Sequence, residues 1–101
     1  MRDYQNHILT WRGIRIRVRY CPEWSESYRR NLGYGLAHLE LDAIGHPLPV
    51  TCTGYRSHFT RPDVVEHHGG PVAFVQAWLN SEARTKTWRK AYAESRQLAL
   101  F

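Results

Sequence analysis

The chain has 101 residues, a length that suits one small domain with one modest core. Hydrophobic residues make up 43% and charged residues 23%, a balance that excludes an intrinsically disordered chain, and no apolar run is long enough to cross a bilayer. The formal net charge is +5 at pH 7, carried mostly by arginine, which suits phosphate or carboxylate partners.

The first residues lack the basic-then-apolar layout of a secretory signal, so we expect a cytoplasmic protein without membrane association. Residues 7–11 and 14–20 are predicted to form a hairpin, because Arg12 and Gly13 between them suit a tight turn. In its second strand the even positions are apolar and the odd positions are arginine, so the two sets lie on opposite faces of a sheet.

Two more strands are predicted after a polar loop over residues 21–35. Residues 36–44 alternate again, with Ala37, Leu39, Leu41 and Ala43 directed inward. Residues 48–59 are predicted to be a fourth strand, weakened or bulged at Gly54.

Helices are predicted in the last third of the chain. Residues 61–71 interrupt the alternation typical of strands and are long enough for a short helical turn. Pro71 suits the first position of a helix. After it, four apolar side chains recur at helical spacing: Val72, Val75, Trp78 and Leu79. A kink near Asn80 and Ser81 is predicted before a narrower stripe formed by Trp88, Ala91, Tyr92 and Ser95.

These elements indicate an α+β fold, in which an antiparallel sheet of about four strands is covered on one face by one or two C-terminal helices. Residues 1–96 form a single domain in this interpretation. Cys21 and Cys52 are too few for a disulfide framework and are expected to be buried free thiols.

The first candidate site is a row of arginines on one strand face, Arg15, Arg17 and Arg19, which would suit the phosphates of a nucleic acid. The alternative is a self-neutralised face, because Glu40 and Asp42 point outward from the next strand and face the arginines if the two strands pair. We favour the neutralised face, because charges on a protein surface often only balance one another and have no binding role.

A second basic region follows in the predicted helix, where Glu82 and Glu94 are the only opposing charges; it consists of Arg84, Lys86, Arg89, Lys90 and Arg96. It is a candidate nucleic-acid surface, although cations near a helix C-terminus also complement the helix dipole. The sequence contains no helix-turn-helix, zinc-finger or ribonucleoprotein pattern that would support the first alternative.

No convincing catalytic or metal site is present in the sequence. The densest group of candidate ligands is His58, His67 and His68 with Asp63 and Glu66, and its spacing matches no known metal motif. We expect solvated loop histidines, no cofactor and no enzymatic activity; His58 and His67 would be the first to mutate if an activity were found.

The segment Thr53-Gly54-Tyr55-Arg56-Ser57-His58-Phe59 concentrates hydrogen-bond donors around a glycine that permits close backbone approach. It resembles a segment of small uncharacterised proteins from proteobacteria and their plasmids and prophages. That resemblance covers most of the chain loosely and implies no activity. A strand-to-loop corner stabilised by its own hydrogen bonds and a ligand-facing loop remain equal alternatives.

The last five residues, Gln97-Leu98-Ala99-Leu100-Phe101, resemble the bacterial sliding-clamp-binding pentapeptide Gln-Leu-(Ser/Asp)-Leu-Phe. Polymerases, mismatch-repair proteins and several plasmid and phage proteins carry that motif. The resemblance implies docking onto the clamp through Gln97, Leu98, Leu100 and Phe101. Because Leu100 and Phe101 fall off the preceding helical stripe, an extended tail is favoured over a core helix; the alternative is a terminus docked on its own sheet.

The sequence therefore predicts a small non-enzymatic binding module of a plasmid or phage system that docks onto the DNA polymerase sliding clamp. The alternative is a basic accessory or regulatory protein that binds nucleic acid and whose tail is purely structural. A counter-defence inhibitor is a weaker alternative, because DNA mimicry requires negative charge and this chain has an arginine excess.

Overall fold

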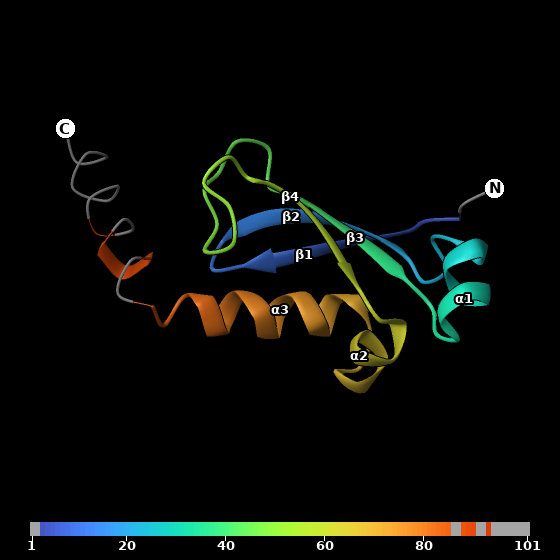
Figure 1. Cartoon of the computed structure of the whole chain (residues 1–101). Helices are drawn as coiled ribbons and strands as arrows, with labels where there is room; N and C mark the ends of the chain where they lie inside the picture. The colour runs from blue at the N-terminus through green and yellow to red at the C-terminus, as the bar shows by residue number, and fades with distance from the viewer. Residues whose placement is uncertain (1–2, 86–87, 91–92, 94–101) are drawn as a thin grey trace.

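The computed structural model of the protein describes residues 3–85, 88–90 and 93 (Figure 1). The elements follow one another as β1 (Gln5–Trp11), β2 (Ile14–Cys21), α1 (Glu26–Leu32), β3 (Ala37–Asp42), β4 (Tyr55–Thr60), α2 (Pro62–His67) and α3 (Pro71–Glu82). The four strands form one antiparallel sheet in the order β1-β2-β3-β4. The α2 and α3 helices lie against one face, and α1 lies at the end of the sheet near the N-terminus (Figure 1). The predicted α+β fold is confirmed.

The β1–β2 hairpin closes where the sequence predicts it. Trp11 pairs with Ile14 as the last pair of the ladder. Arg12 and Gly13 between them both have positive φ, 49° and 81°. This pair of conformations matches the twist of the strands, and it costs a glycine little.

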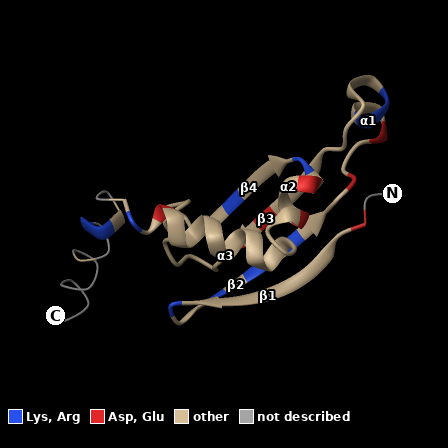
Figure 2. Cartoon of the chain, turned by 90° about the horizontal axis from the view of Figure 1, so that it is seen from below, with Lys and Arg blue, Asp and Glu red and all other residues tan. Residues whose placement is uncertain are grey.

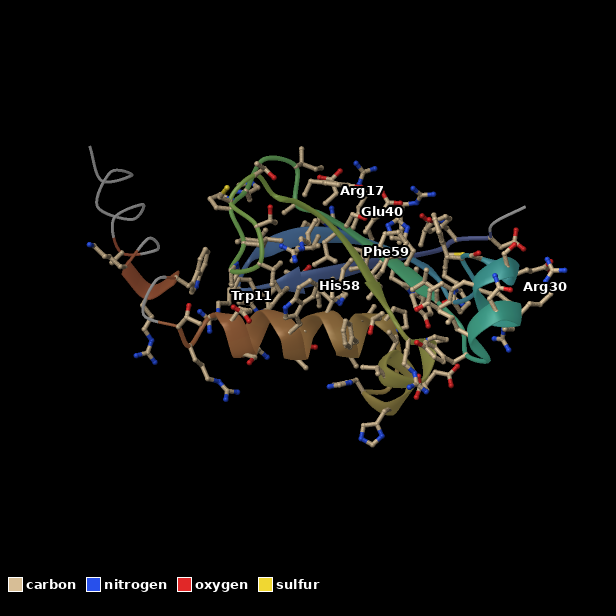
Figure 3. The ribbon with its side chains drawn as sticks, in the orientation of Figure 1. Trp11, Arg17, Arg30, Glu40, His58 and Phe59 are labelled. Carbon is tan, nitrogen blue, oxygen red and sulfur yellow. The ribbon has the colours of Figure 1, made fainter. Side chains whose placement is uncertain are left out.

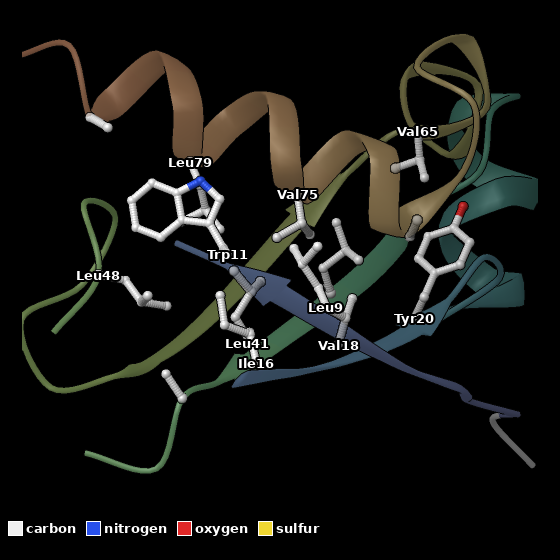
Figure 4. Close-up of a cluster of buried hydrophobic side chains, with 14 residues drawn as sticks. Leu9, Trp11, Ile16, Val18, Tyr20, Leu41, Leu48, Val65, Val75 and Leu79 are labelled. Atoms are coloured by element: carbon white, nitrogen blue, oxygen red, sulfur yellow. The ribbon is translucent and has the colours of Figure 1, made fainter. Parts of the chain in front are cut away.

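The core lies between the sheet and α3 (Figure 4). Period-two alternation sends Ile16 and Val18 of β2 and Leu39 and Leu41 of β3 to this inner face, where all four are fully buried. From α3, Val75 and Leu79 complete the layer and are also fully buried. Trp11 and Asn80 tie the hairpin to the helix, because the Trp11 indole Nε1 donates to Asn80 Oδ1 at 2.9 Å. We call the opposite surface, which carries the β2 arginines, the outer face.

The start of α3 is as predicted, but the predicted kink at Asn80 and Ser81 is wrong. Pro71 occupies the first turn after Gly70, and the helix continues to Glu82. The hydrogen bond from Trp11 holds Asn80 within the helix, and the helix gives way to turns only at Ala83. Trp88 then packs against the core, 6.3 Å from Trp11 between ring centroids; the other three residues of the predicted stripe, Ala91, Tyr92 and Ser95, lie outside the described residues.

Residues 21–35 are not only a loop, because they contain α1. Ser25 caps its N-terminus by accepting a hydrogen bond from the Tyr28 amide at 3.1 Å. Gly33, at φ 78°, ends the helix and donates its amide to the Arg29 carbonyl. No residue of α1 is buried, so the helix has no apolar stripe. The sequence signals for the helix are the caps Ser25 and Gly33, with Glu26 in the first turn and Arg29 and Arg30 in the last.

The fourth strand is shorter than predicted, since β4 begins at Tyr55 and Leu48 and Thr51 form only an isolated bridge. Gly54 lies in the turn before the strand with φ 88°, not at a bulge within it. A Cβ at Gly54 would lie 2.8 Å from the His46 carbonyl oxygen. The close approach that the glycine permits is therefore to the chain's own loop.

The described part of the chain contains no helix that is both long and apolar enough to span a bilayer. Of the two cysteines, Cys21 is buried as expected, whereas Cys52 is exposed, and both are free thiols.

Candidate functional site

The β2 arginines lie on the outer face, where two of them meet carboxylates of β3. Arg17 Nη2 lies 3.4 Å from Asp42 Oδ2, and Arg19 Nη1 lies 3.1 Å from Glu40 Oε1. The strand register places each pair directly across the ladder. Figure 3 shows Arg17 and Glu40 on the side of the sheet away from α3. Arg15 is exposed and forms no ion pair with an acidic side chain of the described residues. The row is thus partly neutralised, with one cation in excess.

A shallow hollow of about 350 Å³ lies on this face beside the ion pairs. Its lining includes Asn6 and Ile8 of β1, Arg17 and Arg19 of β2, and Tyr55 of β4. The Tyr55 hydroxyl donates to Glu40 Oε2 at 2.8 Å, and this hydrogen bond, followed by burial, raises the pKa of Tyr55 above its usual value. The Tyr55 ring is therefore held in place, although half of it is exposed.

His38 organises the other end of the outer face. It is buried, 8% exposed, and both of its ring nitrogens are engaged: Nδ1 lies 2.5 Å from the Tyr4 hydroxyl and Nε2 lies 2.6 Å from Ser57 Oγ. Phe59 of β4 stacks on the imidazole at 4.4 Å between centroids, and Trp24 meets the Phe59 ring edge-on at 4.9 Å. Four segments of the chain thus converge on one polar and aromatic cluster.

The second basic region lies beyond the end of α3, apart from the arginines of β2 (Figure 2). Arg84, Arg89 and Lys90 are exposed there. Lys86 and Arg96 lie outside the described residues. So does the predicted clamp-binding tail, Gln97, Leu98, Leu100 and Phe101.

Among the described residues, no three histidine, cysteine or acidic side chains are grouped so that they could hold a metal ion. His67 and His68 are exposed, as the sequence predicts, although His67 is the last residue of α2 and not part of a loop. His58 is not a solvated loop residue: it lies in β4 and is half-buried against Trp78, at 4.5 Å between ring centroids.

Residues 4–88 match the family model of the KlcB third domain. The chain belongs to the KlcB third-domain family. KlcB is encoded on plasmids, so the match also makes this a plasmid-associated domain. No curated protein and no solved structure matched the chain.

The KlcB third-domain match includes every named strand and helix of the structure. It also includes the arginine row and the cluster around His38. It ends at Trp88, whose side chain packs against the core. Gln97 and the residues after it therefore lie beyond the matched domain.

Acidification should destabilise this KlcB-type domain through His58. Burial, and after it the Arg56 guanidinium, lowers the pKa of His58 below 6.5. The unfolded chain takes up a proton near that pH while the folded domain resists it, so stability falls as the pH drops from about 6.5 through the lower folded pKa. We expect His58→Gln to reduce the pH dependence of the free energy of unfolding, measured by urea denaturation at pH 7.5 and at pH 5. An unchanged dependence would show that His58 titrates alike in both states. His67→Gln, at an exposed position, is the control.

Proposed function

We propose that this domain is a non-enzymatic binding module of a plasmid-borne protein, and that it docks onto the bacterial DNA polymerase sliding clamp. The observation that carries the proposal is the segment Gln97-Leu98-Ala99-Leu100-Phe101, which agrees with the clamp-binding pentapeptide at four of five positions. Ala99 replaces the usual serine or aspartate, at the position of the motif that tolerates most variation.

The folded body supports a separate role for these residues. The residues of its buried hydrophobic cluster lie between Leu9 and Ala83 in the sequence, and Trp88 packs against this cluster. Because the family match also ends at residue 88, the pentapeptide is an addition to the domain in sequence.

The energetics favour a weak but specific contact. Burying Leu98, Leu100 and Phe101 in apolar pockets would contribute roughly 1.5–3 kcal/mol each. Lost translational freedom and the ordering of the peptide take back a large part of that gain. A Kd in the micromolar range, about −8 kcal/mol, is the expected outcome, and the repeated sites of a clamp raise the avidity.

A nucleic-acid-binding function is the second candidate, and the structure supports it more at the basic region after α3 than at the arginine row of β2. Arg17 and Arg19 are paired with carboxylates, which reduces the net positive charge that the β2 row presents to the closely spaced phosphates of duplex DNA. The exposed Arg84, Arg89 and Lys90 keep the helical region as a candidate. Binding to duplex DNA with a steep salt dependence would favour this function.

The test is binding to purified clamp by surface plasmon resonance. The full chain should bind with a micromolar Kd, and a variant that lacks residues 97–101 should lose at least about a hundredfold in affinity, ~2.7 kcal/mol. Phe101→Ala should reproduce most of the loss. Leu32→Ala, which shortens a half-exposed side chain of α1, is the matched control and should bind like the full chain. Binding that survives the deletion would reject the proposal.

A further inference from the structure

We propose that the outer face of the sheet binds single-stranded nucleic acid. In this site Tyr55 and Phe59 of β4 stack on bases, and Arg15 and Arg17 of β2 contact phosphates. The inference goes beyond clamp docking, because it uses residues of the folded body and none of residues 97–101.

Two aromatic rings are available for stacking on this face. Tyr55 is 49% and Phe59 45% exposed, and both belong to the outward-facing set of β4, because they pair with Asp42 and His38 of β3. They are four positions apart on one strand, so their Cα atoms are separated by about 13.6 Å. Two rings spaced along an open sheet can each stack on a base of the same unpaired strand, whereas paired bases in a duplex are closed to them.

Both rings are held before any ligand arrives. Phe59 lies against the imidazole of His38, which is itself fixed by hydrogen bonds on both nitrogens, and against the edge of Trp24. The Tyr55 hydroxyl is anchored on Glu40. A ring that is already ordered loses little conformational entropy on binding, so its exposed area is available for affinity.

The surroundings of the rings favour a nucleic acid over a protein partner. Arg15, Arg17 and Arg19 occupy outward positions of β2, and on the same face a hollow of about 350 Å³ includes Asn6 and Tyr55 in its lining. Single-strand sites combine aromatic rings with a cationic track, and this face presents the same combination.

The ion pairs on this face do not block phosphate contacts. Arg15 has no carboxylate partner among the described residues. The pair between Arg17 and Asp42 is long, at 3.4 Å, and its side chains are 61% and 41% exposed. Such a pair contributes little, so a phosphate can replace the carboxylate at small cost. With three arginines against two carboxylates, the row keeps a positive excess.

The proposal is tested by fluorescence anisotropy with a labelled twelve-residue oligothymidine, the matching oligouridine and a short duplex hairpin. The full chain should bind at least one single strand more tightly than the duplex; the ratio of the two single strands tells DNA from RNA. Phe59→Leu, which keeps an apolar side chain but removes the ring, should weaken single-strand binding roughly tenfold, and Phe59→Trp should retain it. Arg15→Gln should reduce the slope of log affinity against log salt by about 0.7.

Matched controls separate this site from the other surfaces. Arg30→Gln removes an exposed arginine of α1 outside the row and should leave single-strand affinity unchanged.

Equal affinity of Phe59→Leu and the full chain would overturn the proposal, and so would a preference for duplex. Loss of binding in Arg84→Gln/Arg89→Gln but not in Phe59→Leu would do the same. A cooperative urea-unfolding transition, followed by tryptophan fluorescence, confirms that Phe59→Leu is folded; should it fail to fold, Tyr55→Leu carries the test. Deleting residues 97–101 should leave single-strand affinity unchanged, so the two proposals fail separately.

Discussion

Replacing Leu41 with alanine is expected to lower the free energy of unfolding by about 2–5 kcal/mol. Leu41 is fully buried in β3, directly across the ladder from the equally buried Val18. It belongs to the cluster beneath α3 (Figure 4), so its loss removes apolar contacts and leaves a cavity between sheet and helix. Urea denaturation followed by tryptophan fluorescence measures the change.

The control is Ile8→Ala on the outer face of β1, where the side chain is 56% exposed. It should change the free energy of unfolding by no more than about 0.5 kcal/mol, because little apolar area is buried there. Similar losses in the two variants would mean that the core does not lie between the sheet and α3.

Gly54→Ala is expected to destabilise the domain by about 2–4 kcal/mol. The residue has φ 88°, a conformation that costs other residues strain energy. The added Cβ would lie 2.8 Å from the His46 carbonyl oxygen and 3.0 Å from the Gly45 nitrogen. Both are backbone atoms, so the loop cannot relieve the contact by rotating a side chain.

Gly13→Ala provides the matched comparison. Gly13 has a similar φ of 81°, but nothing lies within 4 Å of its Cβ position. It should therefore show only the conformational cost, about 1 kcal/mol. The difference between the two alanine variants, measured by urea denaturation, isolates the contact with the loop; equal losses would contradict the close approach at Gly54.

The parts of the fold that bury one face were predictable from the sequence. Strict alternation in β2 and β3 assigns the inward side chains, and Pro71 fixes the start of α3. The α1 helix was missed because none of its residues is buried, so it leaves no apolar period. The start of β4 is misplaced in the sequence analysis because Thr51 and Thr53 are β-branched residues that favour a strand. In the structure their side chains instead hydrogen-bond locally to the Tyr55 backbone, before the strand begins.

The candidate site was predictable only where neighbouring strands determine it. The pairing of Arg19 with Glu40 follows from two consecutive strands that meet in register, and it is present. The cluster around His38 draws on Tyr4 and Ser57, which lie 34 and 19 positions away in sequence. Alternation marks His38 only as outward-facing, and no local pattern shows that two other segments cover it.

The tail's role is tested most directly by a peptide of residues 94–101 on its own. The proposed docking predicts that the labelled peptide binds purified sliding clamp with a micromolar Kd and displaces the full chain from it. A peptide with Phe101→Ala should do neither. If the native peptide fails to bind while the intact chain binds, the contact comes from the folded body, and clamp docking through residues 97–101 is contradicted.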